Sequence, residues 1–394
     1  TQGPVNQTNV VGESAKFGVQ AVGGNLSYQW SLNTVPLTGA TNSTLTLTNV
    51  QMNQAGTYSV LVSNNVSTIS TAAVLTVVSP VLRNEWSFNE SGGTTAVDSI
   101  SSSNITLLGG TSLGGGVLTL PGGAGNYAQF PNGILSTYSN SITIETWFPD
   151  NGGLTWARPW SFGGDTSGPN NNFTHGNYID LIPTAGNANG INGGMWAEFN
   201  HNGNTDAHTA TPLPTGTEEY VAVTYQVWDQ TARLYLNGVQ VAIATNITFT
   251  PSDQGFTYNN FLGLDQWNDA IFNGTYDEMR IWNGAVTPLY EMLSAAAGPS
   301  VLITNTTPQS VNISVNTSQV VGQIQQATVS AGFIQVSSAP ITALATNWVS
   351  SNPGVVTVDS NGVITAVGHG TATVSAPFSG ITGISSTVTV SPSL

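Results

Sequence analysis

Cysteine is absent from the chain of 394 residues. This absence excludes disulfide bonds, thiolate metal ligands and a cysteine nucleophile. Basic residues are also scarce, because five Lys and Arg face 20 Asp and Glu, for a formal net charge of −15. So few cations cannot neutralise a phosphate backbone or an anionic lipid surface. We therefore expect no nucleic-acid partner and no binding to anionic membranes.

Long apolar runs are missing as well. No run approaches the roughly 18 residues that a membrane-spanning helix needs, so we expect no membrane insertion. The chain begins at Thr1 without a basic stretch followed by an apolar core. We interpret it as a mature chain from which a signal peptide has been removed. This predicts a secreted protein, extracellular or at the cell surface.

The residues that are present favour an all-β fold. Hydrophobic residues make up 39% of the chain and aromatic residues 9%, which is enough for packed cores. Charged residues make up only 6%, against about 25% in an average soluble protein. The rest is rich in Gly, Thr, Ser and Asn, which favour strands and turns over helices.

Charge divides the chain into three parts. Residues 1–79 carry only Glu13 and Lys16, and residues 299–394 carry only Asp359. All other acids and all arginines lie between them. The composition changes at Ser-Pro and Gly-Pro steps, which are typical of linkers. We predict three β-sandwich domains, at 1–79, 80–298 and 299–394.

The first segment contains the motifs YQW and NQAGTYSV. With these motifs it resembles an immunoglobulin-like domain. The resemblance implies that Trp30 is the core tryptophan and Tyr58 the tyrosine-corner residue. The two bridging cysteines of the family correspond to Val19 and Val60, so this core has to hold by packing alone.

The middle segment shows a hairpin and a helix in its pattern. In RLYLNGVQVAI, Asn237 and Gly238 separate two alternating runs, which predicts a two-residue type I′ turn. Near the end of the segment, Thr287 is a suitable helix cap, Pro288 suits a first turn, and Gly298 is a stop signal. We expect one short helix there.

Four stretches of the middle segment share a resemblance. They are EWSFNESGGTTAVDS at 85–99, SITIETWF at 141–148, EEYVAVTY with RLYLNGVQVA, and NGTYDEMRIWNGAV at 273–286. These resemble the LamG/concanavalin-A-like jelly roll. Domains of this kind bind glycans, bind proteins or space other modules, and the fold does not choose among these functions.

The arrangement of acids argues against an enzyme. Glucanases with this fold carry three acids on one strand as E-x-D-x-x-E, and retaining hydrolysis needs two carboxylates about 5–5.5 Å apart. No such run occurs in this chain. Glu218 and Glu219, like Asp277 and Glu278, are adjacent, so on a strand they point to opposite faces. No G-x-S-x-G motif occurs either. We predict no catalytic residues.

The resemblance also implies a calcium site. Relatives often place acids at the positions of Asn89, Asp98 and Asp277, and calcium favours such oxygen ligands. Position 89 is commonly Asp in the family, and Asn weakens the site. The alternative is that these acids bond to nearby backbone without metal.

Aromatic and histidine side chains gather at 151–215 among many Asn and Gly residues. Aromatic faces and amides together suit stacking on sugar rings and hydrogen bonding to their hydroxyls. The alternative is that most of these rings are core, since residues 156–165 correspond to a family strand with buried aromatics. The candidate ligand-binding residues are Trp156, Trp160, His175, Tyr178, Trp196 and His201.

The last segment contains TNWVSSNPGVVTVDSNGVITAVGHGTATVSA at 346–376. It resembles a bacterial Ig-like domain of the second group. The resemblance implies a core position for Trp348 and a hairpin turn at 360–362.

Two functions of different classes remain. The first is a non-catalytic structural or adhesive protein that associates with copies of itself, because nearly uncharged outer segments offer little repulsion. The alternative is a carbohydrate-binding protein whose middle domain is the lectin and whose outer domains are spacers.

Overall fold

The computed structural model describes residues 2–11, 13–48, 50–138, 141–164, 176–186, 193–200, 203–267 and 269–393. These residues are almost entirely in strands and turns, which confirms the all-β prediction. Within them, one α-helix is present, α1 at Pro288–Ala297. No helix of this part of the chain is long and apolar enough to cross a membrane.

The first segment forms a five-stranded sheet in the order β1-β7-β6-β3-β4 and a two-stranded sheet of β2 and β5. Strand β1 runs parallel to β7 and covers that edge of the sheet. The bounds are β1 Gln7–Val10, β2 Ala15–Gly18, β3 Ser27–Leu32, β4 Val35–Pro36, β5 Thr44–Leu47, β6 Gly56–Ser63 and β7 Thr68–Val78, with a 3-10 turn, η1, at Met52–Gln54.

The core of this segment is a cluster of buried aromatic and aliphatic side chains. Trp30 and Tyr58 are buried, and the Tyr58 hydroxyl donates to the Gln54 carbonyl at 2.9 Å. Val19 and Val60 lie in the same cluster of buried side chains. The core therefore holds by apolar packing, without a covalent bridge.

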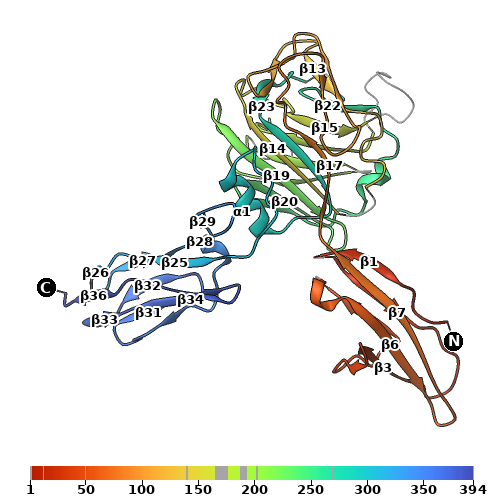
Figure 1. Ribbon diagram of the computed structural model, residues 1–394, viewed down its shortest axis with the longest axis vertical. Coiled ribbons are helices and arrows are strands. Elements are labelled where there is room, and N and C mark those ends of the chain that lie inside the picture. The colour runs from red at the N-terminus through yellow and green to blue at the C-terminus, as the bar shows by residue number, and fades with distance from the viewer. Residues whose placement is uncertain are drawn as a thin grey trace. The chain divides into compact units, whose positions relative to one another are not determined.

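Most strands of the middle segment lie in two facing sheets (Figure 1). One sheet has six strands in the order β21-β20-β19-β14-β24-β8. Its bounds are β8 Val81–Trp86, β14 Ile142–Pro149, β19 Glu218–Gln226, β20 Thr231–Leu236, β21 Val239–Ala244 and β24 Glu278–Asn283.

The facing sheet has eight strands in the order β18-β17-β16-β15-β22-β13-β10-β9, and a smaller sheet joins β11, β12 and β23. The bounds are β9 Thr95–Ala96, β10 Ile105–Leu108, β11 Ser112–Gly114, β12 Val117–Pro121, β13 Tyr127–Gln129, β15 Trp160–Gly163, β16 Tyr178–Ile182, β17 Trp196–Asn200, β18 Asn204–His208, β22 Asn259–Leu262 and β23 Asn273–Tyr276, with a 3-10 turn, η2, at Pro251–Gln254.

One apolar core lies between the two large sheets. It contains Trp86, Phe130, Trp160, Phe162 and many aliphatic side chains, all nearly inaccessible to solvent. Since successive side chains of a strand point to opposite faces, the residues between these core positions face away from the core. We call these two surfaces the outer faces of the eight-stranded and the six-stranded sheet.

The predicted hairpin and helix are both present. Asn237 and Gly238 join β20 to β21, and both have positive φ angles, 51° and 77°, as a type I′ turn requires. The Thr287 side chain accepts a hydrogen bond from the backbone N–H of Tyr290 at the start of α1.

The last segment is built from short strands in four three-stranded sheets. Trp348 was predicted to lie in the core. The structure corrects this prediction, because Trp348 is only half-buried in this segment. Its ring lies against Gly362, in a turn where a side chain would collide with it. The bounds are β25 Ser310–Ser314, β26 Ser318–Val320, β27 Ile324–Gln326, β28 Thr328–Gly332, β29 Ala339–Pro340, β30 Val349–Ser350, β31 Val356–Val358, β32 Val363–Ala366, β33 Gly370–Ala372, β34 Val374–Phe378, β35 Ile381–Ile384 and β36 Val388–Ser391, with a 3-10 turn, η3, at Thr342–Leu344.

By internal contacts the chain forms two compact units. One comprises Thr1–Leu236 and Gln240–Val286, and the other comprises Asn237–Val239 and Thr287–Leu394. Helix α1 thus belongs to the second unit, together with the hairpin turn at Asn237–Val239.

Candidate functional site

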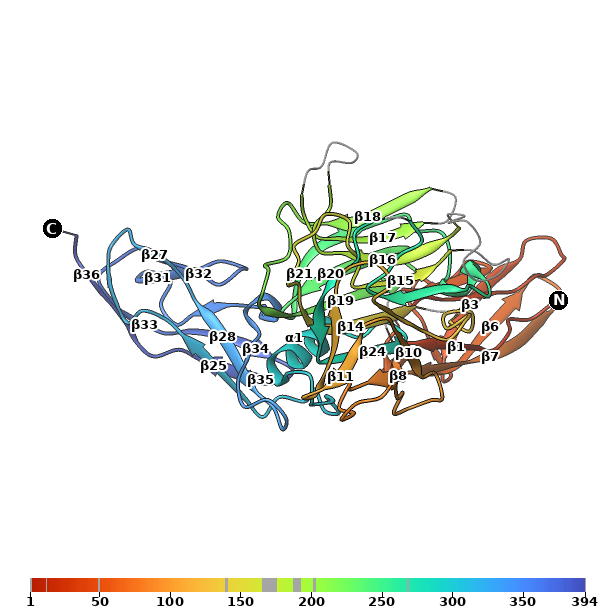
Figure 2. The same cartoon turned by 90° about the horizontal axis from the view of Figure 1, so that it is seen from above.

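The outer face of the eight-stranded sheet carries a row of polar side chains. Strands β15, β16, β17 and β18 lie side by side (Figure 2), and Ser161, Asp180, Glu198 and Asp206 are direct partners across them. Directly opposed residues have Cβ atoms about 4.5–5.5 Å apart. The sheet therefore brings three carboxylates together from three consecutive strands.

Arg158, which precedes β15, reaches into this row. Its Nε donates to Asp180 at 2.6 Å, and its Nη1 donates to Asp265 at 2.5 Å and to Asp269 at 2.9 Å. Its guanidinium carbon lies 4.4 Å from the ring centre of Trp267, in the geometry of a cation–π contact. We call these five residues the Arg158 site.

The charges of the Arg158 site do not balance, because one cation faces three aspartates. Burial raises the pKa of Asp180 to about 7, and Arg158 lowers it only in part, while Glu198 raises it further. Burial also raises the pKa of Asp265 to about 7. Although burial disfavours its charge, the surrounding aspartates raise the pKa of Arg158. Arg158 therefore stays charged, and the three aspartates together offer more negative charge than this one cation can balance.

Several buried polar atoms of this face have no hydrogen-bond partner among the residues that the structure describes. They are Asp180 Oδ1, Ser161 Oγ and both amide atoms of the Gln266 side chain. Each of these residues is at most 1% exposed. Buried polar groups without partners are rare and costly, and ordered water or a ligand often satisfies them. Their position beside Arg158 marks this face as a candidate binding site.

Aromatic rings border the same site. Trp156 and Trp267 are half-buried, and the Trp156 carbonyl accepts a hydrogen bond from Arg158 at 2.9 Å. Tyr178 meets Trp267 edge to face at 4.7 Å between ring centres, and Trp196 meets Trp156 likewise at 5.7 Å. The site thus combines apolar ring surfaces with carboxylate and amide groups.

The structure separates the predicted ligand-binding residues. Trp156, Tyr178 and Trp196 lie on the outer face of the eight-stranded sheet, but the last two are only 2% and 1% exposed. Trp160 points into the core and packs on Phe162, so it is not placed to meet a ligand. His175 and His201 lie outside the described residues.

The prediction did not include Arg158, Asp180, Asp265 or Trp267. One signal was present in the sequence, because Asp180 interrupts the apolar run YIDLI and Glu198 interrupts WAEFN. An acid on a buried strand needs a partner. The partner comes from segments that only the fold brings near, so periodicity could not identify it.

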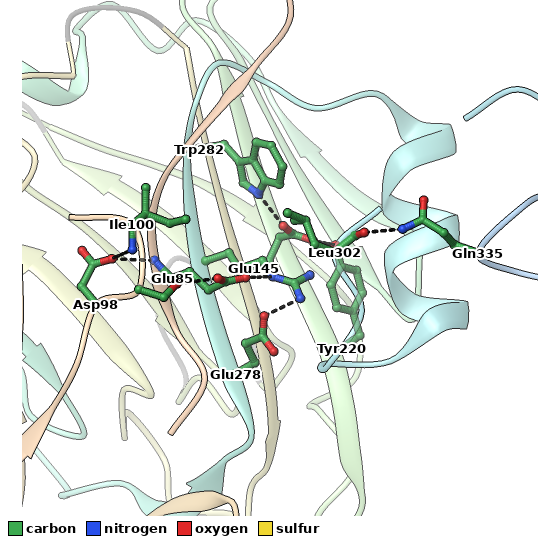
Figure 3. Close-up of polar contacts among 11 residues, drawn as sticks. Glu85, Asp98, Ile100, Glu145, Tyr220, Glu278, Trp282, Leu302 and Gln335 are labelled. Atoms are coloured by element: carbon green, nitrogen blue, oxygen red, sulfur yellow. Dashed lines mark hydrogen bonds and ion pairs between the residues drawn. The ribbon is translucent and has the colours of Figure 1, made fainter. Parts of the chain in front are cut away.

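The outer face of the six-stranded sheet holds a second set of charges (Figure 3). Glu145 accepts hydrogen bonds from the Tyr220 hydroxyl at 2.8 Å and from the Trp282 indole at 2.5 Å. Arg280 pairs with Glu278 and, at 3.3 Å, with Glu85.

In this second cluster Arg280 is paired with two carboxylates, and Glu145 accepts from two uncharged donors. Arg280 is 1% exposed and lies over the Trp147 ring, with 4.9 Å between the guanidinium carbon and the ring centre. Burial raises the pKa of Glu278 to about 8, and Arg280 lowers it only in part. We interpret this cluster as structural, since buried charges paired in this way fix one packing arrangement.

The structure shows the present contacts of the three predicted calcium positions. Asp98 accepts hydrogen bonds from the side chains of Asn84 and Ser101 and from three backbone N–H groups. Those donors already occupy both of its oxygens. The backbone N–H of Asp277 donates to the Trp147 carbonyl, and Asn89 has its side-chain oxygen near Gly116. In the described ranges no group of three or more His, Asp or Glu side chains is placed to hold a metal ion. Calcium therefore stays a prediction.

Comparison with known proteins agrees with the fold of the middle segment. A family model described as the concanavalin A-like lectin/glucanases superfamily matches residues 122–289. Together with the two facing sheets, this match identifies the middle segment as a concanavalin A-like jelly roll of the LamG type. No curated protein matches the chain by sequence.

Solved structures give weaker likenesses. Domain 4 of AbnA, an extracellular GH43 arabinanase from Geobacillus stearothermophilus solved with arabinotriose, is 22% identical with a TM-score of 0.40. That match covers 53% of this chain and 95% of the domain. The titin M3 domain is 21% identical with a TM-score of 0.18, over 19% of this chain and 91% of the domain. The immunoglobulin-like and bacterial Ig-like assignments of the outer segments stay predictions.

Proposed function

We propose that this chain is a non-catalytic, extracellular adhesive protein whose jelly roll binds a glycan at the Arg158 site. One observation carries the proposal. Within the described part of the chain, Asp180 Oδ1 is fully buried and has no hydrogen-bond partner, and it lies beside two half-buried indole rings, those of Trp156 and Trp267. A ligand with hydroxyl groups on a ring offers the donors that this face lacks.

The chemistry of the site suits a sugar. A carboxylate accepts hydrogen bonds from hydroxyl groups, and an amide such as that of Gln266 both donates and accepts. Indole rings present flat apolar surfaces, on which the C–H face of a sugar packs. Arg158 fixes Asp180 and Asp265 in place, so the binding groups are held in position before the ligand arrives.

The same geometry supports a non-catalytic role. Asp180 and Glu198 are direct cross-strand partners. Among the described residues, we consider this pair the nearest to the two carboxylates of a hydrolase. However, Asp180 is held by Arg158 in an ion pair of 2.6 Å. A hydrolase needs both carboxylates free to act on the glycosidic bond and on water.

A glycan array followed by calorimetric titration tests this proposal. The best oligosaccharide on the array should bind the unmodified protein, and Trp267→Ala should weaken that binding at least tenfold. Trp228→Ala is the matched control, because Trp228 is also half-buried but lies in the turn between β19 and β20. Equal affinity in the two variants, or release of reducing sugar by the unmodified protein, contradicts the proposal.

A second function, association with copies of the same chain, is supported by a separate observation. Strand β21 is an edge strand of the six-stranded sheet, and Val241 and Ile243 are 39% and 52% exposed on it. An exposed apolar edge strand is a template for pairing with another chain. The outer segments add surfaces that are almost free of charge.

Light scattering after size-exclusion chromatography tests the second function. We expect oligomers that dissociate when Val241 and Ile243 are both replaced by Lys, a residue that blocks edge pairing. A matched double change at Thr106 and Thr119 to Lys, which lie outside strand β21, should leave the oligomers intact. A monomeric unmodified protein at high concentration contradicts this function.

A further inference from the structure

A polar cavity of about 160 Å³ lies beside the edge strand β8, away from the Arg158 site. Four separate parts of the jelly roll line it: β8, the loop before β10, the turns after β13 and the end of β24. A cavity of about 150 Å³ is large enough to hold one six-membered ring such as benzene. The size therefore suits a single small ring.

The floor of this cavity is held rigid by hydrogen bonds. The Tyr138 hydroxyl donates to Asn84 Oδ1 at 2.7 Å, and Asn84 Nδ2 donates to Asp98 at 2.6 Å and to Ser101 at 3.0 Å. Burial raises the pKa of Tyr138 to well above its ordinary value, so its hydroxyl stays protonated. The floor cannot rearrange without losing several of these bonds.

A β-bulge places Arg83 at this cavity. In the pairing of β8 with β24, Ile281 faces Asn84 and Trp282 faces Leu82, so Arg83 is the extra residue. Neighbouring residues of a regular strand point to opposite faces, yet Arg83 and Asn84 both line the cavity. Bulges commonly redirect a side chain in this way, and they are frequent beside functional sites.

The Arg83 guanidinium has no ion-pair partner among the described residues. Arg158, Arg233 and Arg280 all pair with acids, so Arg83 is the arginine of this part of the chain that does not. In a chain with a net charge of −15, an arginine without an acidic partner is unexpected. A guanidinium presents a planar fork of donors that matches a carboxylate.

The remaining groups of the lining suit hydroxyls. Asn283 Oδ1 is buried and accepts no hydrogen bond from any described residue. Thr137 and Ser103 add two hydroxyl groups to the lining. A ligand for this cavity thus needs one carboxylate and several hydroxyl groups on a single ring.

We propose that this cavity binds a hexuronate, a sugar ring with one carboxylate, and that Arg83 holds the carboxylate. The site is separate from the Arg158 site and does not depend on the function proposed for it. It gives the jelly roll a second binding position, selective for acidic sugars.

Nuclear magnetic resonance with ¹⁵N-labelled arginine tests the proposal directly, because the chain has few arginines. Titration with glucuronate should shift the Nε signal of Arg83, which is assigned by its loss in Arg83→Gln. Glucose, which lacks the carboxylate, should cause at most a tenth of that shift at the same concentration. Added salt should weaken glucuronate binding, since the contact is ionic.

Two variants provide the controls. Arg83→Gln should weaken glucuronate binding at least tenfold, whereas Arg83→Lys, which keeps the charge, should recover part of it. Lys16→Gln removes the same charge from the exposed part of strand β2 and should leave binding unchanged. Trp267→Ala should also leave it unchanged, which separates this proposal from the one for the Arg158 site.

Three outcomes overturn the proposal. They are an Arg83 signal that glucuronate does not move, equal shifts with glucose and glucuronate, and equal losses of binding in Arg83→Gln and Lys16→Gln. An Arg83 signal that does not move means that glucuronate does not displace water from the cavity.

Discussion

Arg158 is the residue on which the outer face of the eight-stranded sheet depends. It is 4% exposed and pairs with two aspartates that are themselves nearly inaccessible to solvent. Removing one partner of a buried ion pair leaves charge uncompensated. We therefore expect Arg158→Met to lower the free energy of unfolding by roughly 3–5 kcal/mol, as urea titration measures it.

Arg233→Met is the matched control for that change. Arg233 pairs with Asp229 at 3.0 Å, but both side chains are about one-fifth exposed, at 22% and 19%. Solvent screens such a pair, so its loss should cost under about 1 kcal/mol. Equal costs in the two variants would show that the Arg158 site is not a buried electrostatic cluster.

Stability should also depend on pH through the buried acids. The pKa of Asp180 is raised to about 7 and that of Glu278 to about 8 in the folded state, above the value of about 4 for an unfolded chain. Between these values the folded state holds protons that the unfolded state has released. The free energy of unfolding should therefore fall as pH rises from about 4 to 8.

Urea titrations at pH 5 and pH 8 measure this dependence. The unmodified protein should be more stable at pH 5, and Asp180→Asn with Glu278→Gln should reduce the difference. A protein equally stable or more stable at pH 8 contradicts the raised pKa values.

Single residues were predictable where a local motif defines them. Trp30 and Tyr58 lie in motifs whose packing is set by the neighbouring strands, and both are buried as expected. Trp348 was assigned to the core by its motif but is only half-buried, with its ring against Gly362. Arg158 could not be predicted, because its partners Asp180 and Asp265 come from other strands and loops.

Among the elements, the turn between β20 and β21 requires a glycine at position 238, because of both its backbone conformation and its neighbours. Gly238 has a φ of 77°, and a Cβ there would lie 2.7 Å from Met292 Cα in α1. Gly238→Ala should therefore suffer both backbone strain and a collision. Gly216 has a similar φ of 74° but open space around it, so Gly216→Ala should cost only the strain, about 1–2 kcal/mol.

Thermal unfolding of the two alanine variants gives the comparison. We expect Gly238→Ala to lower the melting temperature clearly more than Gly216→Ala does. Equal decreases would show that the turn does not pack against α1.

The elements themselves were largely predictable. Alternating runs predicted the strands, Asn237 and Gly238 predicted the hairpin, and Thr287 predicted the start of α1, because each signal is local. The two large sheets needed the resemblance to a family, since strand order depends on contacts between distant residues. The bulge at Arg83 gave no signal, because it arises from the register of two strands.

At the scale of the whole molecule, the jelly roll carries nearly all of the charge and the outer segments almost none. Asp98, the predicted calcium ligand with most hydrogen bonds, already has five protein donors around it. A chelator such as EDTA tests the predicted calcium site, because an ion that binds the folded state raises its stability, and an unchanged melting temperature would remove the prediction. A decrease of several degrees that added calcium reverses would establish a calcium site.

Fluorine nuclear magnetic resonance of protein labelled with 5-fluorotryptophan shows whether a glycan binds at the Arg158 site. The signals of Trp156 and Trp267 are assigned by replacing each with Phe, and the oligosaccharide that binds best is then titrated. We predict that these two signals shift with a common binding curve while those of Trp30 and Trp160, both buried in cores, stay in place. Saturation by the oligosaccharide with no change at Trp156 and Trp267 would show that the glycan binds elsewhere.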